Sequence, residues 1–191
     1  MDTDGLTFAC ATTAEERVAK RAGLNAARVG VRVANGVPKG RLVSFGLAGA
    51  LRGGLGVGDV LDATRVVDEQ GATLWEGGPL GVPGARAVTV LGSDVLVHDA
   101  VERRRLHESS GADVVDMESG VLARSGRLAG VVRVISDDVT STIEGVDKTV
   151  HPDGRTDPLG LLRFLGAKRT DGVRSVFGAI VALRALEKAV A

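Results

Sequence analysis

Short apolar runs alternate with charged or amphipathic stretches along the chain, and the two patterns predict different elements. Runs rich in Val, Leu and Ile predict strands at residues 6–11, 25–33, 41–45, 60–67, 86–91 and 131–135. The charged or amphipathic stretches predict helices at residues 13–22, 98–110, 117–128, 159–165 and 173–189. Alternation of this kind is typical of an α/β fold. We therefore expect a single domain over residues 1–191, with a central mixed β-sheet flanked by helices.

The segments between these elements carry turn sequences. Residues 46–51, GLAGAL, follow a predicted strand and form a glycine-bearing turn, where backbone N–H groups can meet phosphate or sugar. Residues 68–83 predict an exposed excursion, in which Trp75 is expected to cover part of the core. Residues 140–157 predict a mobile loop or lid.

The first helix has its own start and stop signals. Thr12 or Thr13 is the expected cap, since Thr13 and Glu16 have capping-box spacing, and Gly23 ends the helix. Acidic residues stabilise a helix N-terminus, and a strand-to-helix corner is also a common place for a ligand site. Both interpretations therefore stay open for Glu15 and Glu16.

The composition changes this picture by excluding several classes of function. Charged residues make up 25% of the chain and the formal net charge is zero, so no nucleic-acid partner or acidic membrane surface is indicated. The single cysteine, Cys10, excludes an internal disulfide, suits a reducing compartment and is expected to be buried and inert. No apolar run approaches the roughly 18 residues of a membrane span, and the N-terminus has no signal-peptide pattern. We expect a cytoplasmic protein without stable membrane insertion, and the three histidines lack metal-ligand spacing.

Carboxylates also stand at the ends of two later apolar elements, which an α/β fold can bring together. Asp116 and Glu118 open a helix, while Asp137 and Asp138 end a buried strand. Helix capping and ordinary turns are the alternative explanations for these residues. Arg133 is a charge inside the apolar strand, and its burial requires a partner, either a site carboxylate or another subunit.

Three separated segments resemble the nucleoside phosphorylase/nucleosidase superfamily. Residues 43–60 contain VSFGLAGAL and VGDV, which are similar to the glycine-bearing turn and following strand of that superfamily. Residues 115–118, VDME, resemble its Met-Glu ribose-binding segment. Residues 132–137, VRVISD, resemble its strand that ends in a catalytic aspartate. The order and approximate spacing agree over residues 6–138, which makes the joint occurrence more specific than any one segment.

Within the superfamily, the chain looks most like the short hopanoid-associated phosphorylases. The supporting residues are DMES at 116–119, SD at 136–137 and DGRTD at 153–157, together with the short length. This resemblance implies removal of adenine from an adenosylhopane-type nucleoside. The resemblance also implies a phosphorylase/hydrolase-like fold, a purine nucleoside as the small-molecule partner, a homo-oligomer, and no cofactor other than phosphate as a possible co-substrate.

The resemblance implies roles for particular residues. Asp137 would protonate the departing purine, and Glu118 would hold ribose hydroxyls and stabilise positive charge at the anomeric carbon, with Met117 packed on the sugar. Glu15 or Glu16 would position a water in a hydrolase. The remaining substrate-binding residues implied by the resemblance are Leu47, Ala48, Gly49, Leu96 and Val97.

Two departures from the superfamily pattern leave the chemistry open. Leu47 stands where relatives often carry a serine or threonine, which weakens the case for phosphorolysis, although backbone N–H groups can still bind an anion. Residues 95–97 are aliphatic where relatives often stack an aromatic side chain on the base. The alternatives are a methylthioadenosine/S-adenosylhomocysteine or futalosine-type nucleosidase, and a nucleoside-binding module that has lost catalysis.

Overall fold

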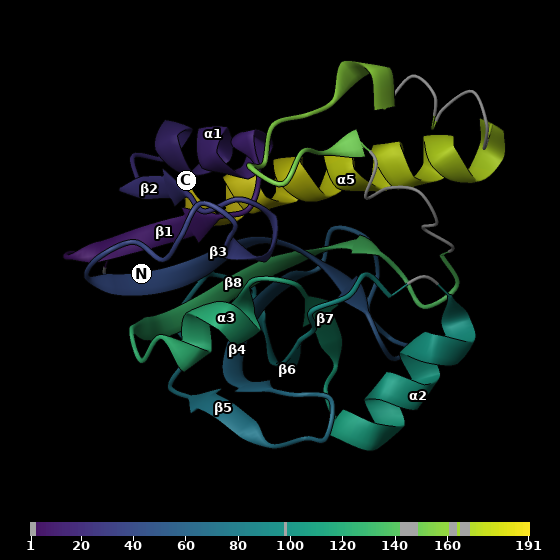
Figure 1. Ribbon diagram of the computed structural model, residues 1–191, viewed down its shortest axis with the longest axis horizontal. Coiled ribbons are helices and arrows are strands. Elements are labelled where there is room, and N and C mark those ends of the chain that lie inside the picture. The colour runs from purple at the N-terminus through teal and green to yellow at the C-terminus, as the bar shows by residue number, and fades with distance from the viewer. Residues whose placement is uncertain (1–2, 98, 142–148, 161–163, 165–168) are drawn as a thin grey trace.

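A mixed β-sheet with helices on both faces forms the molecule (Figure 1). The computed structural model describes residues 3–97, 99–141, 149–160, 164 and 169–191. Within this part of the chain the sheet has eight strands: β1 (Leu6–Cys10), β2 (Ala26–Arg28), β3 (Arg41–Ala50), β4 (Val60–Val67), β5 (Thr73–Glu76), β6 (Arg86–Gly92), β7 (Val114–Asp116) and β8 (Leu128–Asp137). The predicted mixed α/β fold is therefore confirmed.

Five of the strands close into a ring. β8 pairs in parallel with β3 and antiparallel with β4, β4 pairs in parallel with β6, and β6 pairs in parallel with β7. A short antiparallel pairing of β7 with the end of β3 completes the ring. β1 pairs in parallel with the first half of β3, and β2 pairs in parallel with β1, so these two strands extend the sheet beyond the ring. β3 therefore has partners along both edges, and its carboxyl end lies beside that of β8.

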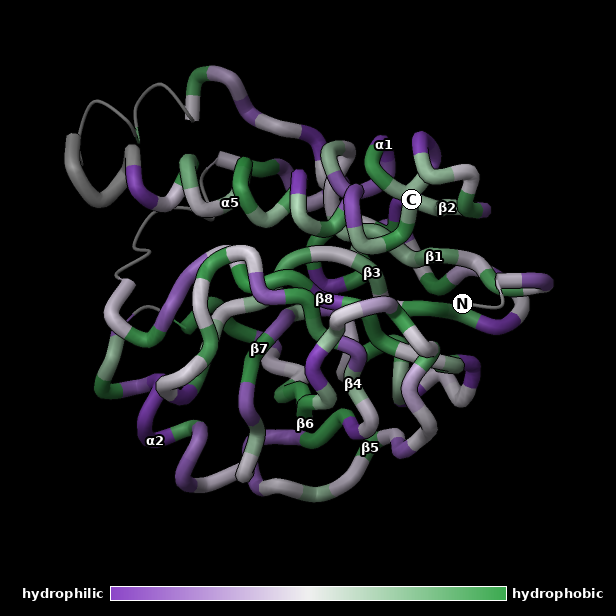
Figure 2. Tube along the Cα trace, turned by 180° about the vertical axis from the view of Figure 1, so that it is seen from behind, coloured by the Kyte–Doolittle hydropathy of each residue, from purple (hydrophilic) through white to green (hydrophobic). Residues whose placement is uncertain are grey.

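The helices cover the two faces of the sheet unequally. α1 (Thr13–Arg21) and α5 (Arg169–Val190) lie side by side on one face, while α3 (Ser119–Arg124) covers the other and α2 (Ala100–Ser110) lies at one end (Figure 1). η1 (Val31–Val33) is a short 3-10 turn after β2. Alternate residues of β3 serve the two faces, since Leu42 packs in the core beneath α3 and Val43 in the core beneath α1 and α5. Hydrophobic segments recur along the strands of the sheet (Figure 2). Among the described residues, no helix is long and apolar enough to cross a membrane.

Several predicted boundaries are wrong by small amounts. The predicted turn at residues 46–51 is instead the second half of β3, because pairing with β8 and β7 continues it as far as Ala50. The capping box of α1 is formed by Thr12 and Glu15, one residue earlier than the Thr13–Glu16 spacing predicts. The helix predicted at residues 117–128 is only six residues long, and the strand that follows begins three residues earlier than predicted.

Other predictions are confirmed or lie outside the described residues. The predicted boundaries of β4 are correct, and Trp75 packs against the core, although its segment forms the edge strand β5. Residues 142–148 of the predicted lid, and most of the helix predicted at 159–165, lie outside the described residues. Cys10 is fully buried, and burial raises the pKa of its thiol, as expected for an inert core residue.

Two glycines allow α3 to approach the sheet closely. An added Cβ at Gly92, the last residue of β6, would lie 2.4 Å from the Cα of Gly120 in α3. The atoms of Gly120 that this Cβ would meet, its Cα and N, belong to the backbone, so no side-chain rotation can relieve the contact. Because α3 begins next to Glu118, this packing sets the position of that carboxylate relative to the sheet.

Replacing Gly92 with alanine should therefore destabilise the fold. We expect Gly92→Ala to lower the free energy of unfolding by about 1–3 kcal/mol, the usual cost of overpacking. The measurement is urea denaturation. Gly53→Ala is the matched control, since an added Cβ there meets nothing within 4 Å. Equal stability of the two variants would contradict the close-packing argument.

Candidate active site

A cavity of about 350 Å³ opens beside the carboxyl ends of the parallel strands β3 and β8. This volume lies in the range of roughly 300–1,000 Å³ that is typical of small-molecule sites. Its wall is largely apolar and carries a small set of charged side chains from five different elements or their ends: Glu15, Arg103, Asp116, Glu118 and Asp137. Strand ends in an α/β fold are a common place for a ligand, and here they hold the charges.

The end of the cavity near α3 is organised by Asp116. Its Oδ1 accepts hydrogen bonds from the backbone N–H groups of Glu118, at 3.1 Å, and Ser119, at 2.8 Å. These bonds cap the first turn of α3 and hold Glu118 at its entrance. Glu118 is 6% exposed, and its Oε1 accepts a hydrogen bond from the backbone N–H of Arg32 at 3.1 Å. Arg32 has a φ of 53°, an uncommon conformation for a residue with a side chain.

Arg133, in β8, is the buried counter-ion of this end of the cavity. Its Nε lies 2.7 Å from Asp116 Oδ2 and its Nη2 lies 3.7 Å from Glu118 Oε2. Nη2 also donates a hydrogen bond to Ser44 Oγ at 2.6 Å. Arg133 is 1% exposed, so these contacts replace the water that a buried cation loses. The sequence left open whether a carboxylate or a second subunit pairs with Arg133, and the structure shows two site carboxylates.

Burial and like charge leave Glu118 poorly ionised. Burial raises the pKa of Glu118 to about 8, the charges of Asp116 and Glu15 also raise it, and Arg133 opposes the rise. Burial lowers the pKa of Arg133, but Asp116, Glu118 and Glu15 outweigh this effect and leave it above its usual value. The cation therefore stays charged while Glu118 can change its protonation state near neutral pH.

Glu15 lines the cavity from the first turn of α1. Its Oε2 accepts hydrogen bonds from the backbone N–H of Thr12 at 2.8 Å and from the Thr12 hydroxyl at 3.0 Å. Its Oε1 accepts a hydrogen bond from the backbone N–H of Leu47 at 3.0 Å. Gly46 makes room for this carboxylate, since a Cβ at that position would lie 2.2 Å from Oε1. The Glu15 side chain thus both caps helix α1 and lines the cavity.

Asp137 lies at the other end of the cavity and is paired with Arg103 of α2. Arg103 Nη2 lies 2.5 Å from Asp137 Oδ2, and the hydroxyl of Ser136 donates to Asp137 Oδ1 at 2.7 Å. Gly49 pairs with Asp137 across the β3–β8 ladder and leaves room for both charged groups. Because Gly49 is two residues beyond Leu47, the points at which Asp137 and Glu15 contact β3 are roughly 7 Å apart.

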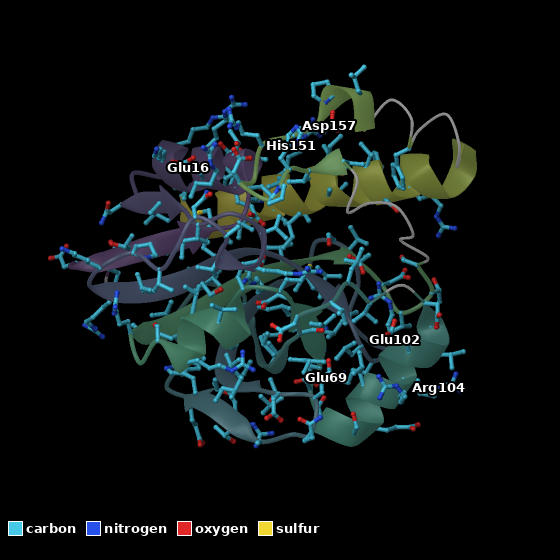
Figure 3. The ribbon with its side chains drawn as sticks, in the orientation of Figure 1. Glu16, Glu69, Glu102, Arg104, His151 and Asp157 are labelled. Atoms are coloured by element: carbon cyan, nitrogen blue, oxygen red, sulfur yellow. The ribbon has the colours of Figure 1, made fainter. Side chains whose placement is uncertain are left out.

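The cavity brings together nearly all the site residues expected from the sequence. Glu15, Asp137 and Glu118 line it, and so do the remaining predicted substrate-binding residues: Leu47, Ala48, Gly49, Leu96, Val97 and Met117. Glu16 does not line it, because its carboxylate pairs with Lys20 at 2.6 Å on the outside of α1 (Figure 3). Of the two glutamates expected to position a water, only Glu15 therefore lines the cavity.

Arg103 is the site residue that the sequence did not reveal. The segment around it alternates in charge, a pattern typical of a solvated helix face, yet Arg103 is 1% exposed and lines the cavity. Leu106 and Ser110 are buried on the same face of α2, at three and seven residues from Arg103. That helical spacing is the signal that could have marked the arginine as inward-facing. Among the described residues, no group of three or more His, Cys, Asp and Glu side chains is arranged to hold a metal ion.

The fold is similar to those of solved nucleosidases. No protein-family model and no curated protein matches the sequence. The 5′-methylthioadenosine/S-adenosylhomocysteine nucleosidase of Helicobacter pylori aligns over 98% of this chain and 96% of its own, with a TM-score of 0.62 and 14% identity. The corresponding enzyme of S. pneumoniae aligns over 95% and 99%, with a TM-score of 0.56 and 14% identity.

A futalosine hydrolase mutant of Helicobacter pylori shares the same fold. It aligns over 92% of this chain and 97% of its own, with a TM-score of 0.54 and 14% identity. At identities this low, the structural similarity shows a common fold and nothing more. The fold expected from the three sequence segments is therefore confirmed, while the chemistry has to be argued from the residues in the cavity.

The raised pKa of Glu118 predicts a specific dependence of stability on pH. Between its ordinary value of 4.5 and about 8, the folded state holds a proton that the unfolded state has released. The contribution of this group to stability is therefore present below the lower value and is lost as pH rises through the higher one. Glu118→Gln should remove this loss, so its stability relative to wild type should increase with pH across that window.

The measurement is the free energy of unfolding in urea at about pH 4 and about pH 9, on either side of the window. Glu108→Gln, on the exposed surface of α2, is the control and should follow wild type at both values. A difference between Glu118→Gln and wild type that does not change with pH would contradict the assigned environment of Glu118.

Proposed function

We propose that this protein is a nucleosidase that hydrolyses the N-glycosidic bond of an adenine nucleoside with an apolar 5′ substituent. The observation that carries the proposal is the arrangement of Glu15, Glu118 and Asp137 around one cavity of nucleoside size. Three carboxylates in separate surroundings suit the three tasks of this reaction: activating water, stabilising the sugar cation and assisting the base.

The chemistry assigns one end of the cavity to each part of the substrate. Glu118 accepts hydrogen bonds from the ribose hydroxyls, and its carboxylate stabilises the positive charge that develops at the anomeric carbon. The purine lies against Val97 and Leu96, with its N7 edge toward Asp137. The bond from the anomeric carbon to N9 breaks, and its electron pair leaves with the purine.

Water rather than phosphate is the proposed nucleophile. Glu15 takes a proton from the water as the water oxygen bonds to the anomeric carbon, and Asp137 gives its proton to N7 of the departing purine. The backbone N–H of Leu47, one possible anion donor, is already bound to Glu15. A phosphate placed there would meet the carboxylate, and like charges repel. Leu47 also lacks the hydroxyl expected of a phosphate-binding residue.

The apolar wall supports the choice of 5′ substituent. Val176, Ala179 and Leu183 of α5 and Phe164 line the cavity and offer no charge to a polar group. The Helicobacter pylori enzyme with a similar fold has been observed with 5′-methylthioadenosine in its active site, which makes this nucleoside the first substrate to test. An adenosylhopane-type nucleoside, suggested by the DMES and DGRTD segments, is the second and tests a larger apolar group.

Removing either catalytic carboxylate should abolish most of the activity. We expect Asp137→Asn and Glu15→Gln each to lower kcat for adenine release by about 10²–10⁴-fold, the usual contribution of a positioned acid or base. The assay is adenine release from 5′-methylthioadenosine, and folding is checked by circular dichroism. Each variant has a neighbour as its control, Asp138→Asn and Glu16→Gln, and these should keep most of the wild-type rate.

Failure of the matched pairs to differ would contradict the catalytic assignment. If wild type binds nucleosides without releasing adenine from any of them, the protein is a binding module instead. Release of adenine with 5-methylthioribose 1-phosphate as the sugar product, and only when phosphate is present, would show phosphorolysis and contradict the role given to Glu15.

The protonation of Glu118 should appear in the pH dependence of the reaction. Because the ionised carboxylate is the form that stabilises the sugar cation, kcat/KM should rise with pH as the free enzyme titrates at about 8. Glu118→Gln should lower kcat/KM and remove this rise. A profile for wild type that is flat between about pH 6 and 9 would contradict the role of Glu118.

A further inference from the structure

The outward face of α5 carries apolar side chains that have no cover. α5 lies on one face of the sheet, and its outward side includes Phe177, which is 65% exposed, and Ile180, which is 44% exposed (Figure 1). Phe177 is the one exposed ring among the five aromatic residues of the chain. These two side chains are three residues apart and so neighbour each other on the helix surface. Contact with an apolar partner would remove both from water, which is favourable.

Basic side chains share this face. Arg174, Arg184 and Lys188 are exposed, and at 3.6 residues per turn all three point within about 60° of Phe177 around the helix axis. Arg184 and Lys188 have no ion-pair partner among the described residues. The outward face of α5 is therefore a mixed surface, on which cations alternate with an aromatic and an aliphatic side chain.

Acidic side chains offset little of this charge. Among the described side chains of α5, residues 174–190, Glu187 is the one acid, and it lies at the edge of the face, 3.5 Å from Arg21 of α1. A hydrogen bond from Thr140 and, more weakly, the charge of Arg174 lower the pKa of Asp138, so Asp138 lies near Arg174. Arg184 and Lys188 therefore carry the unbalanced positive charge.

A second copy of the chain is a poor partner for this face. In a two-fold dimer the same surface meets itself, so Arg184 and Lys188 would approach their own copies. Like charges repel, and nearby described acids do not balance them. The apolar part of the face is also only two side chains, whereas a stable interface contains about 20–30 residues on each partner.

We propose that the outward face of α5 is a peripheral docking surface for an anionic lipid bilayer. Such a bilayer offers anionic headgroups to Arg184 and Lys188 and hydrocarbon to Phe177 and Ile180, and it requires no groove of matching shape. The formal net charge of the chain is zero, which indicated no acidic membrane surface, but that sum averages over all faces.

The docking surface adjoins the cavity. Val176, Ala179 and Leu183, on the same turns of α5, line the apolar wall, and Val176 is four residues before Ile180. A bilayer bound to the outward face would therefore lie next to one wall of the cavity. The inference does not depend on the proposed function, because binding to lipid requires no turnover.

Cosedimentation with vesicles tests the surface. Each cation near an anionic bilayer contributes roughly 5-fold, so wild type should bind phosphatidylserine-containing vesicles about 25-fold more tightly than phosphatidylcholine vesicles. The double variant Arg184→Gln, Lys188→Gln should lose this preference, and so should wild type at about 1 M salt, where the charges are screened. Phe177→Gln should bind both kinds of vesicle about 10-fold more weakly and keep the preference.

Helix α2 supplies matched controls. Val101 is 79% exposed there, and Arg104, Arg105 and Glu108 are exposed around it, so this surface carries charges of both signs. The double variant Arg104→Gln, Arg105→Gln should bind both kinds of vesicle as wild type does, and so should Val101→Gln. All the substituted side chains are exposed, and circular dichroism checks that each variant folds.

Several outcomes would overturn the proposal. Wild type that binds neither kind of vesicle, or both equally, has no docking surface for anionic lipid. Equal losses in the α2 and α5 double variants would show attraction without a particular face. Light scattering covers the remaining case, since a wild-type oligomer that Phe177→Gln converts to a monomer would assign the face to a second copy instead.

The result is separate from that for the nucleosidase. Phe177, Arg184 and Lys188 do not line the cavity, so these variants should release adenine from soluble 5′-methylthioadenosine at the wild-type rate. Loss of vesicle binding at a wild-type rate of release supports the docking surface. Vesicle binding by a protein that releases no adenine supports it equally, and contradicts only the proposed function.

Discussion

Two buried arginines and the carboxylates around them constrain the rest of this structure. Arg133 and Arg103 are each 1% exposed, and a cation without water needs an opposite charge close to it. Asp116 and Glu118 supply that charge for Arg133, and Asp137 supplies it for Arg103. Removing one member of such a pair leaves an uncompensated buried charge, so the pairs restrict how β7, β8 and α2 can be arranged.

β3 makes these pairs possible because it carries glycine where charged groups have to pass. Gly46 lies against Glu15 and Arg133, and Gly49 lies against Asp137 and Arg103. Glu15 and Asp137 are therefore spaced along one strand. The backbone of β3 also participates, since Leu47 donates to Glu15 and Ala50 accepts from Arg103. Strand and charge network hold each other in position.

The electrostatics of the network divide the carboxylates by function. Asp116 accepts hydrogen bonds from the first turn of α3 and forms an ion pair with Arg133, so its role is structural. Glu118 is the one whose pKa burial raises to about 8, so a ligand that donates hydrogen bonds can change its charge. Glu15 belongs to a capping box and yet lines the cavity. The same side chains that stabilise local elements are thus available for chemistry.

The amino-acid sequence alone determined the alternation of strands and helices, since apolar periodicity follows from which faces are buried. It also placed Glu118 and Asp137 at the ends of elements, where the order of a parallel sheet brings carboxylates together. It could not extend β3 through GLAGAL, because local glycine content predicts a turn and the hydrogen bonds to β8 and β7 are non-local.

Only the tertiary structure could choose between Glu15 and Glu16, which share a helix turn and differ in the direction they face. It alone showed that Arg103, within a charged helix, is buried against Asp137. The pattern of charges along a helix shows which residues are charged but not which of them are buried. Burial of a charge depends on a partner far away in the chain, as Asp137 is for Arg103.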